Sequence, residues 1–270
     1  GGNIGELAVN GSVNDLVMCG AVPQFLSLSF ILEEGLRMDE FWEVLLGIKK
    51  ASKEAGVSVV TGDTKVVDKG KGDKVFINTT GLGRLHPKAN IHTNRVKPGD
   101  KILVSGPIAQ HGVAILSVRQ GLEFETTITS DTRPVHQPVL KLLDELGEDV
   151  KFLRDPTRGG VATVLNELVM QCGTGIEIIQ KDIPVSEQVE GACEMLGLDP
   201  LYVANEGIFV AVVSLHKANE ALSILKTFDA SASLIGSVTK EHPKQVIQHS
   251  RIGGRRIVSM LPGEQLPRIC

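Results

Sequence analysis

Short apolar segments alternate with longer amphipathic ones along the chain, and this alternation restricts the possible folds more than any other feature. Every second residue is apolar in FLSLSFIL, residues 25–32, which is typical of a strand with one buried face. Residues 40–55 follow with an apolar stripe at helical spacing, and Asp39 and Gly56 are the predicted N-cap and end of that helix. VSVV at 57–60 has the composition of a buried strand.

The same succession continues to the end of the chain. We predict further helices over residues 4–20, 110–119, 134–146, 161–173, 187–196 and 216–228. We predict further strands over residues 75–81, 101–106, 150–153, 175–180, 205–213, 232–238 and, paired around a Gly-Gly turn, 246–249 and 256–260. Strands mixed with amphipathic helices in this way indicate the α/β (α+β) class.

One long polar segment, RLHPKANIHTNRVKPGD, interrupts the pattern and is the best candidate for a domain boundary. We therefore expect an N-terminal domain over residues 1–92, a C-terminal α/β domain over 93–258 and a flexible tail over 259–270. The opening GGNIGELAV has no initiator methionine and reads as the middle of a sequence, so we expect a native N-terminal segment to be missing.

The final segment, LPGEQLPRIC, ends on Cys270. Two prolines and a glycine disfavour a terminal helix or a central strand, so we predict a mobile arm. A thiolate on such an arm is a nucleophile that can reach more than one place. The alternative is a cysteine at a frayed terminus without a role.

Three segments place a carboxylate beside small residues in predicted loops, two of them directly after short apolar strands. Carboxylates in such places suit Mg²⁺, which takes one or two of them and completes its shell with phosphate oxygens. Glycines that open a helix also offer backbone N–H groups to a phosphate. Each segment alone could be an ordinary turn or N-cap, but together they predict a nucleotide site. The candidates are Asn14 and Asp15; Asp63 and Thr64; and Asp155, Thr157, Arg158, Gly159 and Gly160, with Asp15, Asp63 and Asp155 as metal ligands.

Two further residues fit a catalytic role. Lys65, two positions after Asp63, could contact a developing oxyanion or a phosphate, and the alternative is a solvated loop lysine. Glu206, where a polar loop meets an apolar run, could be a general base if it is partly desolvated. The alternative for Glu206 is a solvated turn residue.

Several classes of protein are disfavoured. The sequence has no G-x-x-x-x-G-K-[S/T] loop, and no G-x-G-x-x-G opens a helix after a strand. Aromatic residues make up 4% and the net charge is -4, which gives no general footprint for nucleic acid. No apolar run is long enough for a membrane span, and there is no secretion signal. The histidines lack metal-ligand spacing, so we interpret them as surface or structural residues.

The cysteines support an intracellular site of action. Cys19, Cys172 and Cys193 lie in apolar or helical patterns, so we expect all three to be small buried side chains. None of them forms a C-x-x-C pair, and this usage predicts a reducing cytoplasm.

Taken in chain order, GGNIGELAVNGSVNDLVMCGAVP, TGDTKVV, RDPTRGGVAT, NEG and the terminal PRIC closely resemble the HypE family, the carbamoyl dehydratases of NiFe-hydrogenase maturation. The match covers essentially the whole chain, and PRIC is its most specific element. The family belongs to the superfamily of aminoimidazole ribonucleotide synthetase, selenophosphate synthetase and thiamine-monophosphate kinase.

The resemblance implies two α/β domains, with the first joining its mate in a homodimer so that two four-stranded sheets close into a barrel. It implies ATP and Mg²⁺ at the junction, a carbamoyltransferase (HypF) that loads the terminal cysteine, and transfer of the cyano group to iron on a HypC–HypD complex. Cys270 would be the carrier thiol, whereas Lys65 and Glu206 would lie near the modified tail. The family's acidic, glycine-rich start is absent, so this chain is expected to bind ATP poorly.

Two other readings remain open from the residues. The protein could be a non-catalytic carrier that holds a group on Cys270 for its partners. It could also be another ATP-using member of the superfamily, such as a selenophosphate synthetase, in which the terminal PRIC would have no task.

Overall fold

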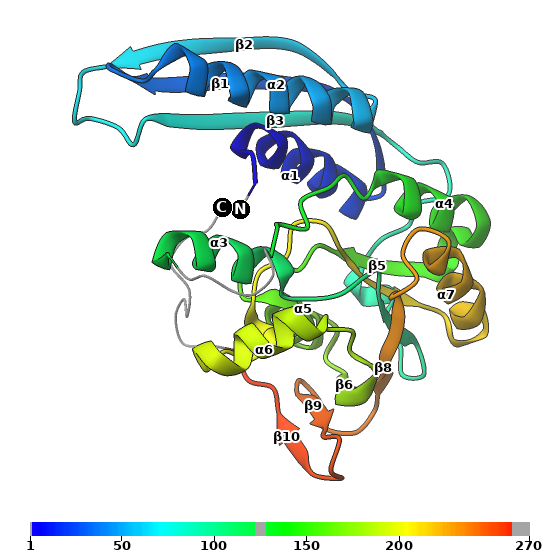
Figure 1. Ribbon diagram of the computed structural model, residues 1–270. Helices are drawn as coiled ribbons and strands as arrows, with labels where there is room; N and C mark the ends of the chain where they lie inside the picture. Colours follow the sequence, from blue (N-terminus) through cyan, green and yellow to red (C-terminus); the bar gives the residue numbers. More distant parts are fainter. Residues whose placement is uncertain (1, 122–127, 261–270) are drawn as a thin grey trace.

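Two β-sheets of unequal size organise the chain (Figure 1). The computed structural model describes residues 2–121 and 128–260, and within these ranges it contains a three-stranded and a seven-stranded sheet. The mixed α/β (α+β) class predicted from the sequence is confirmed. None of the helices in these ranges has the length and apolar character needed to cross a bilayer.

The smaller sheet has the order β2-β1-β3, with helices on one face only. Strand β1 (Ala21–Glu33) pairs in parallel with β2 (Ser58–Val67) and antiparallel with β3 (Val75–Leu85). Helices α1 (Ile4–Met18) and α2 (Met38–Ala55) pack on the face that carries Leu26, Leu28 and Phe30. The resemblance predicted four strands here, and the described residues form three.

Three local expectations for this half of the chain are wrong. Arg37, not Asp39, is the N-cap of α2, and Asp39 instead accepts hydrogen bonds from the Arg37 guanidinium within the first turn. Strand β2 is exposed along almost its whole length, because it forms a sheet edge outside the core. It also runs through TGDTK, which we expected to be a loop. Gly56 ends α2 in a left-handed conformation, as predicted.

The outer face of this sheet has no covering layer among the described residues. Residues paired across neighbouring strands share a face, so Ser29, Asp63 and Asn78 point away from the helices. The same holds for Ile31 and its cross-strand partners Lys65 and Phe76. Four large apolar side chains are exposed there: Phe25, Ile31, Phe76 and Leu82. These form two apolar cross-strand pairs, Phe25 with Leu82 and Ile31 with Phe76, and the polar pair Ser29 and Asn78 lies between them. Exposed apolar groups of this size make the outer face a candidate interaction surface.

The larger sheet has the order β10-β9-β6-β8-β4-β7-β5 and is mostly antiparallel. Its strands are β4 (Lys101–Val104), β5 (Val150–Arg154), β6 (Gly175–Ile179), β7 (Val210–Val213), β8 (Ser233–Thr239), β9 (Val246–His249) and β10 (Arg255–Ile257). The hairpin predicted around Gly253 and Gly254 is present as β9 and β10.

Helices pack on both faces of this sheet. One core contains side chains of α3 (Gln110–Gln120), α5 (Gly160–Cys172) and α6 (Glu187–Leu196). The other contains side chains of α4 (His136–Leu146) and α7 (Ala218–Lys226). Alternation along β4 divides its residues between them, because Ile102 and Val104 join the first core and Leu103 the second.

Helix α1 joins the two halves of the molecule. Val9 and Val13 pack in the core of the smaller sheet, whereas Val17 and Met18 at its other end pack against the α4 side of the larger sheet. Its apolar residues therefore serve two cores, and a cleft between the two halves lies along one of its faces.

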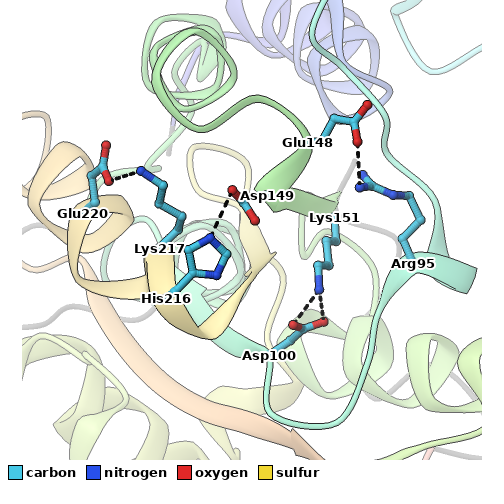
Figure 2. A network of polar contacts seen from close by, with 8 residues as sticks. All are labelled: Arg95, Asp100, Glu148, Asp149, Lys151, His216, Lys217 and Glu220. Carbon is cyan, nitrogen blue, oxygen red and sulfur yellow. Dashed lines mark hydrogen bonds and ion pairs between the residues drawn. The ribbon is translucent and has the colours of Figure 1, made fainter.

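A network of ion pairs fixes the start of β5 (Figure 2). Lys151 Nζ lies 2.7 Å and 2.9 Å from the two carboxylate oxygens of Asp100, and both side chains are well buried. On either side, Arg95 approaches Glu148 at 3.5 Å and His216 approaches Asp149 at 3.5 Å. The network holds the strand whose far end carries the Asp155 segment.

The three described cysteines differ in exposure. Cys193 is buried, as predicted, and Cys172 is half-buried. Cys19 is exposed, because it follows the last turn of α1 instead of lying on its buried face.

Candidate active site

A cleft of about 930 Å³ lies between the two halves of the molecule. One wall consists of one face of α1 together with residues 75–79 of β3. The other wall comes from the larger half and carries Arg154, Asp155, Thr157, Arg158, Thr163, Val164, Glu167 and Glu206. Apolar and charged groups thus converge in a space large enough for a nucleotide.

The Asp155 segment lies at this wall because it directly follows β5 and leads into α5. Arg154, Asp155, Thr157 and Arg158 all line the cleft, as the sequence predicted for the last three. Arg154 Nη2 lies 3.5 Å from Glu167 Oε2 across the first turns of α5. Two guanidinium groups beside carboxylates provide both anion-binding and cation-binding groups.

Gly159 and Gly160 serve the turn rather than the cleft wall. Both have positive φ, and a Cβ on Gly160 would lie 2.5 Å from the carbonyl oxygen of Leu201, so only glycine fits. The Gly160 N–H donates to the Thr157 carbonyl. Their predicted contact with phosphate stays a prediction.

Glu206 is buried, with 6% of its surface exposed, yet it lines the cleft. Its neighbour Asn205 is fully buried and connects it to the Asp155 segment, since Asn205 Nδ2 donates to the carbonyl of Pro156 at 2.9 Å. Asn14 Nδ2, from α1, donates to the carbonyl of Glu206 at 3.2 Å. The condition set by the sequence analysis, a partly desolvated carboxyl, is met.

Burial and the carboxyls nearby raise the pKa of Glu206. Burial is the main cause, and the negative charges of Asp131, Asp155 and Asp15 add to it, so that the pKa of Glu206 rises to about 8. Burial also raises the pKa of Asp155, and the charge of Asp15 raises it further. Groups with such perturbed pKa values are typical of functional sites, and a carboxyl whose pKa lies near neutrality suits proton transfer.

The cleft can hold a cation through Asp15 and Asp155. Asp15 is open to the solvent of the cleft, and partial burial raises the pKa of its carboxyl against the opposing charge of Arg154. Two mutually repelling carboxylates beside the guanidinium groups of Arg154 and Arg158 match Mg²⁺, which uses one or two protein carboxylates together with phosphate oxygens. Asp63 does not join them, because it lies on β2 and does not line the cleft. In the described chain, three mutually close metal-binding groups occur elsewhere, at Glu177, Glu241 and His242.

Asp63, Thr64 and Lys65 lie on the exposed edge strand β2, away from the cleft of their own chain. Their register places Asp63 beside Ser29 and Lys65 beside Ile31, which assigns both to the bare outer face of the smaller sheet. The two predicted groups of site residues therefore lie in different places within one chain. Cys270 lies outside the described residues.

Asp131 is the main residue that the sequence analysis missed. Its carboxylate accepts hydrogen bonds from the N–H groups of Glu206 at 3.1 Å and Gly207 at 3.1 Å. A signal was present, because Asp131-Thr132-Arg133 repeats the Asp, Thr and Arg of the Asp155 segment. Arg154 was missed as well: the predicted strand ended at residue 153, and Arg154 was not considered among the candidates of the segment that follows it, whereas in the structure it is the last residue of β5.

The raised pKa of Glu206 predicts a pH-dependent stability. Between pH 4.5, its ordinary pKa, and about 8, the folded chain binds more protons at this site than the unfolded chain. This contribution is therefore complete below the unfolded pKa and is lost as the pH rises through the folded one. We expect Glu206→Gln to unfold at a higher temperature than the wild type at pH 9, with a smaller difference at pH 5. Thermal unfolding of the ligand-free protein across this range measures it.

The matched control is Glu34→Gln, which neutralises an exposed carboxyl in the smaller half. It should follow the wild-type curve at every pH. Equal unfolding temperatures for Glu206→Gln and the wild type at pH 9 would show that the Glu206 carboxyl is not destabilised by burial.

Comparison with known proteins gives a match over nearly the whole chain. The model of the AIR synthase related protein, N-terminal domain, matches residues 1–85, and that of the C-terminal domain matches residues 97–248. The chain is 47% identical to the carbamoyl dehydratase HypE of Azotobacter vinelandii, over 100% of this chain and 80% of the relative. It is 48% identical to the corresponding protein of Cupriavidus necator, over 100% of this chain and 77% of that one.

Solved structures agree. The crystal structure of hydrogenase maturation protein HypE in complex with ATP superposes with a TM-score of 0.95 at 47% identity, covering 100% of this chain and 82% of that one. That of a HypE–HypF complex gives 0.93 at 46% identity, covering 97% and 85%. A thiamine-monophosphate kinase from Stenotrophomonas maltophilia, at 19% identity over 92% and 78% of the two chains and a TM-score of 0.72, shares the fold alone.

Proposed function

The chain belongs to the HypE family of carbamoyl dehydratases within the AIR synthase related proteins, and from this premise we propose the reaction that its cleft performs. A carbamoyl group carried as a thiocarboxamide on Cys270 is dehydrated to a thiocyanate at the expense of ATP. The observation that carries the proposal is the meeting of Asp155, Thr157 and Arg158 with the buried Glu206 in one cleft.

The first step activates the amide oxygen, which is a poor leaving group. The oxygen attacks the γ-phosphorus of ATP, ADP departs, and the nitrogen releases one of its two protons to solvent, so that an O-phosphorylated imidate with a single N–H remains on the sulfur of Cys270. Arg154 and Arg158 would bind the phosphates, and their position on the same wall of the cleft as Asp155 supports this role. Asp15 and Asp155 would hold Mg²⁺, which supplies charge stabilisation to the transferring phosphoryl group.

The second step forms the nitrile. Glu206 accepts the remaining proton from nitrogen, the electron pair of that N–H bond becomes part of the C≡N bond, and the C–O bond breaks to release phosphate. A base with a pKa of about 8 is a stronger proton acceptor than an ordinary carboxylate, and its burial keeps competing water away. A carrier without catalytic activity would not need a buried carboxyl here, so the cleft favours the enzyme over that alternative.

Asp63, Thr64 and Lys65 enter the proposal through a homodimer. The bare outer face of the smaller sheet carries the exposed apolar residues described above, and burying them against a second copy would remove them from water. Asp63 and Lys65 share that face, so a dimer would carry them toward the partner. In this arrangement Asp63 and Thr64 assist nucleotide binding, and Lys65 stabilises negative charge on the activated oxygen.

The partners follow from the chemistry of the tail. A carbamoyltransferase of the HypF type would load Cys270, which agrees with the solved complex of a HypE with a HypF. A HypC–HypD complex would receive the cyano group for the iron of the hydrogenase. The reaction would take place in the cytoplasm, where thiols remain reduced.

The decisive experiment measures the intact mass of the protein carrying the carbamoyl group on Cys270. Addition of MgATP should remove the mass of one water and release one ADP and one phosphate per loaded chain. ATP hydrolysis without this mass loss, or mass loss without ATP, would contradict the proposed reaction.

A further inference from the structure

The backbone of Glu206 and Gly207 is held by three side chains from two other segments, helix α1 and residues 131–133. The carboxylate of Asp131 accepts the N–H groups of both residues, with Oδ2 accepting that of Gly207 at 3.1 Å. Asn14 Nδ2 donates to the carbonyl of Glu206 at 3.2 Å, and Arg133 Nε donates to that of Gly207 at 2.9 Å. The two backbone N–H groups and the two backbone carbonyls of Glu206 and Gly207 are thus all hydrogen-bonded to side chains distant in sequence.

The contact with Asp131 leaves no room for adjustment. A Cβ on Gly207 would lie 1.8 Å from the carbonyl oxygen of Asp131, so the two backbones pack directly against each other. The two carboxyl oxygens of Asp131 accept the N–H groups of two consecutive residues, which fixes the orientation of both peptides. Asp131 therefore controls both the position and the direction of the peptide that carries Glu206.

The segment around Asp131 is itself fixed. Ser130 Oγ lies 2.7 Å from Nδ1 of the buried His111 in α3 and accepts the N–H of Thr132 at 3.1 Å. Arg133 also pairs with Asp229 at 3.0 Å. These contacts connect the Asp131 segment to α3 and to Asp229, and through Asp131 they restrict the backbone of Glu206.

The buried position of Asp131 is unfavourable for a carboxylate as far as the stability of the fold is concerned. Burial raises its pKa, partly offset by its hydrogen bond from the N–H of Glu206 and by the charge of His111. Its own charge adds to that of the carboxyl of Glu206, so the two repel. It does not line the cleft, which excludes direct contact with a substrate there.

We propose that Asp131 is a positioning residue. It accepts the N–H groups of Glu206 and Gly207 and so directs the Glu206 carboxylate toward the nitrogen of the thiocarboxamide carried on Cys270. The proposal rests on Glu206 being the proton acceptor, as inferred above. Loss of this hold should slow nitrile formation without changing how ATP binds or how the tail is loaded.

The test compares Asp131→Ala and Asp131→Asn in the protein carbamoylated on Cys270. A misplaced catalytic group costs on the order of 10- to 100-fold in rate, so we expect Asp131→Ala to slow single-turnover dehydration by about that factor. Asp131→Asn keeps one acceptor oxygen in the same place and should recover part of the rate. If the alanine variant fails to fold, the asparagine variant alone still tests the proposal. The Kd for ATP and the extent of loading should stay within about twofold, which a fold-wide defect would not permit.

The control is Asp39→Ala, which removes an exposed carboxylate that pairs with Arg37 in the smaller half, outside the cleft. It should dehydrate at the wild-type rate. Hydrogen exchange of the peptide 203–209 should accelerate in Asp131→Ala and not in the control.

Wild-type dehydration by Asp131→Ala would overturn the proposal, as would parallel losses of ATP binding and rate in both Asp131 variants. Glu206→Gln separates the two levels of the argument. If that variant stalls while Asp131→Ala is normal, the positioning role alone falls. If Glu206→Gln dehydrates at full rate, the assignment of Glu206 falls, and the positioning role falls with it.

Discussion

Cys270→Ala is expected to accept no carbamoyl group and therefore to form no thiocyanate. The group is carried through a carbon–sulfur bond, and alanine offers no nucleophile to form that bond. Intact mass after incubation with the carbamoyltransferase and carbamoyl donor should equal that of the unloaded chain. The variant should bind ATP like the wild type, because the proposed nucleotide ligands belong to the cleft and not to the tail.

The other cysteines provide the controls. Cys19 is exposed and is therefore the described cysteine best able to compete with Cys270 for the carbamoyl group. It directly follows α1 within the folded part of the chain and so cannot move between a partner and the cleft. Burial raises the pKa of the Cys193 thiol to about 11, which leaves almost no thiolate at neutral pH. We expect Cys19→Ala to load fully. A carbamoyl adduct on Cys270→Ala, or its loss in Cys19→Ala, would show that the carrier had been wrongly assigned.

The alternation of strands and helices was readable from the sequence because each element buries an apolar face with its own period. Helix α5, with its 3.6-residue period and a closing glycine, illustrates this. The β9–β10 hairpin was predictable for another reason, the Gly253-Gly254 turn, since β10 itself is exposed. The smaller sheet was harder. The segment VSVV looks like a buried strand, but as β2 it lies at an edge, where β-branched residues remain exposed in the single chain.

Of the candidate site, the sequence could predict residue types but not all their partners. Asp155, Thr157 and Arg158 form a local segment, so their presence in one cleft follows from the strand–turn–helix order. Asn14 was expected in an acidic loop with Asp15. It instead lies within α1 and is 2% exposed, and it bonds the carbonyl of Glu206, a contact across 192 positions. Such long-range contacts depend on how α1 packs between the two sheets, which no local pattern encodes.

Glu206→Gln is expected to be loaded on Cys270, to react with ATP and then to stop. Glutamine has the size of glutamate and keeps a carbonyl oxygen, so the bonds from Asp131 and Asn14 to the backbone remain. It cannot accept the proton from nitrogen, and loss of a general base costs about 10²- to 10⁴-fold in rate. One ADP should therefore form per loaded chain, while the mass of the adduct gains a phosphoryl group in place of losing water.

This stalled state distinguishes a lost base from lost nucleotide binding. If Glu206 served only to bind ATP or Mg²⁺, the glutamine variant would release no ADP and would keep the mass of the carbamoylated chain. In the wild type the rate should rise with pH through the ionisation of Glu206, because only the carboxylate accepts a proton, and the glutamine variant should lose this dependence. Full-rate nitrile formation by the variant would remove Glu206 from the reaction. A stall after phosphoryl transfer would place its carboxylate at the proton-transfer step, where its burial at the floor of a charged cleft gives it a pKa suited to that task.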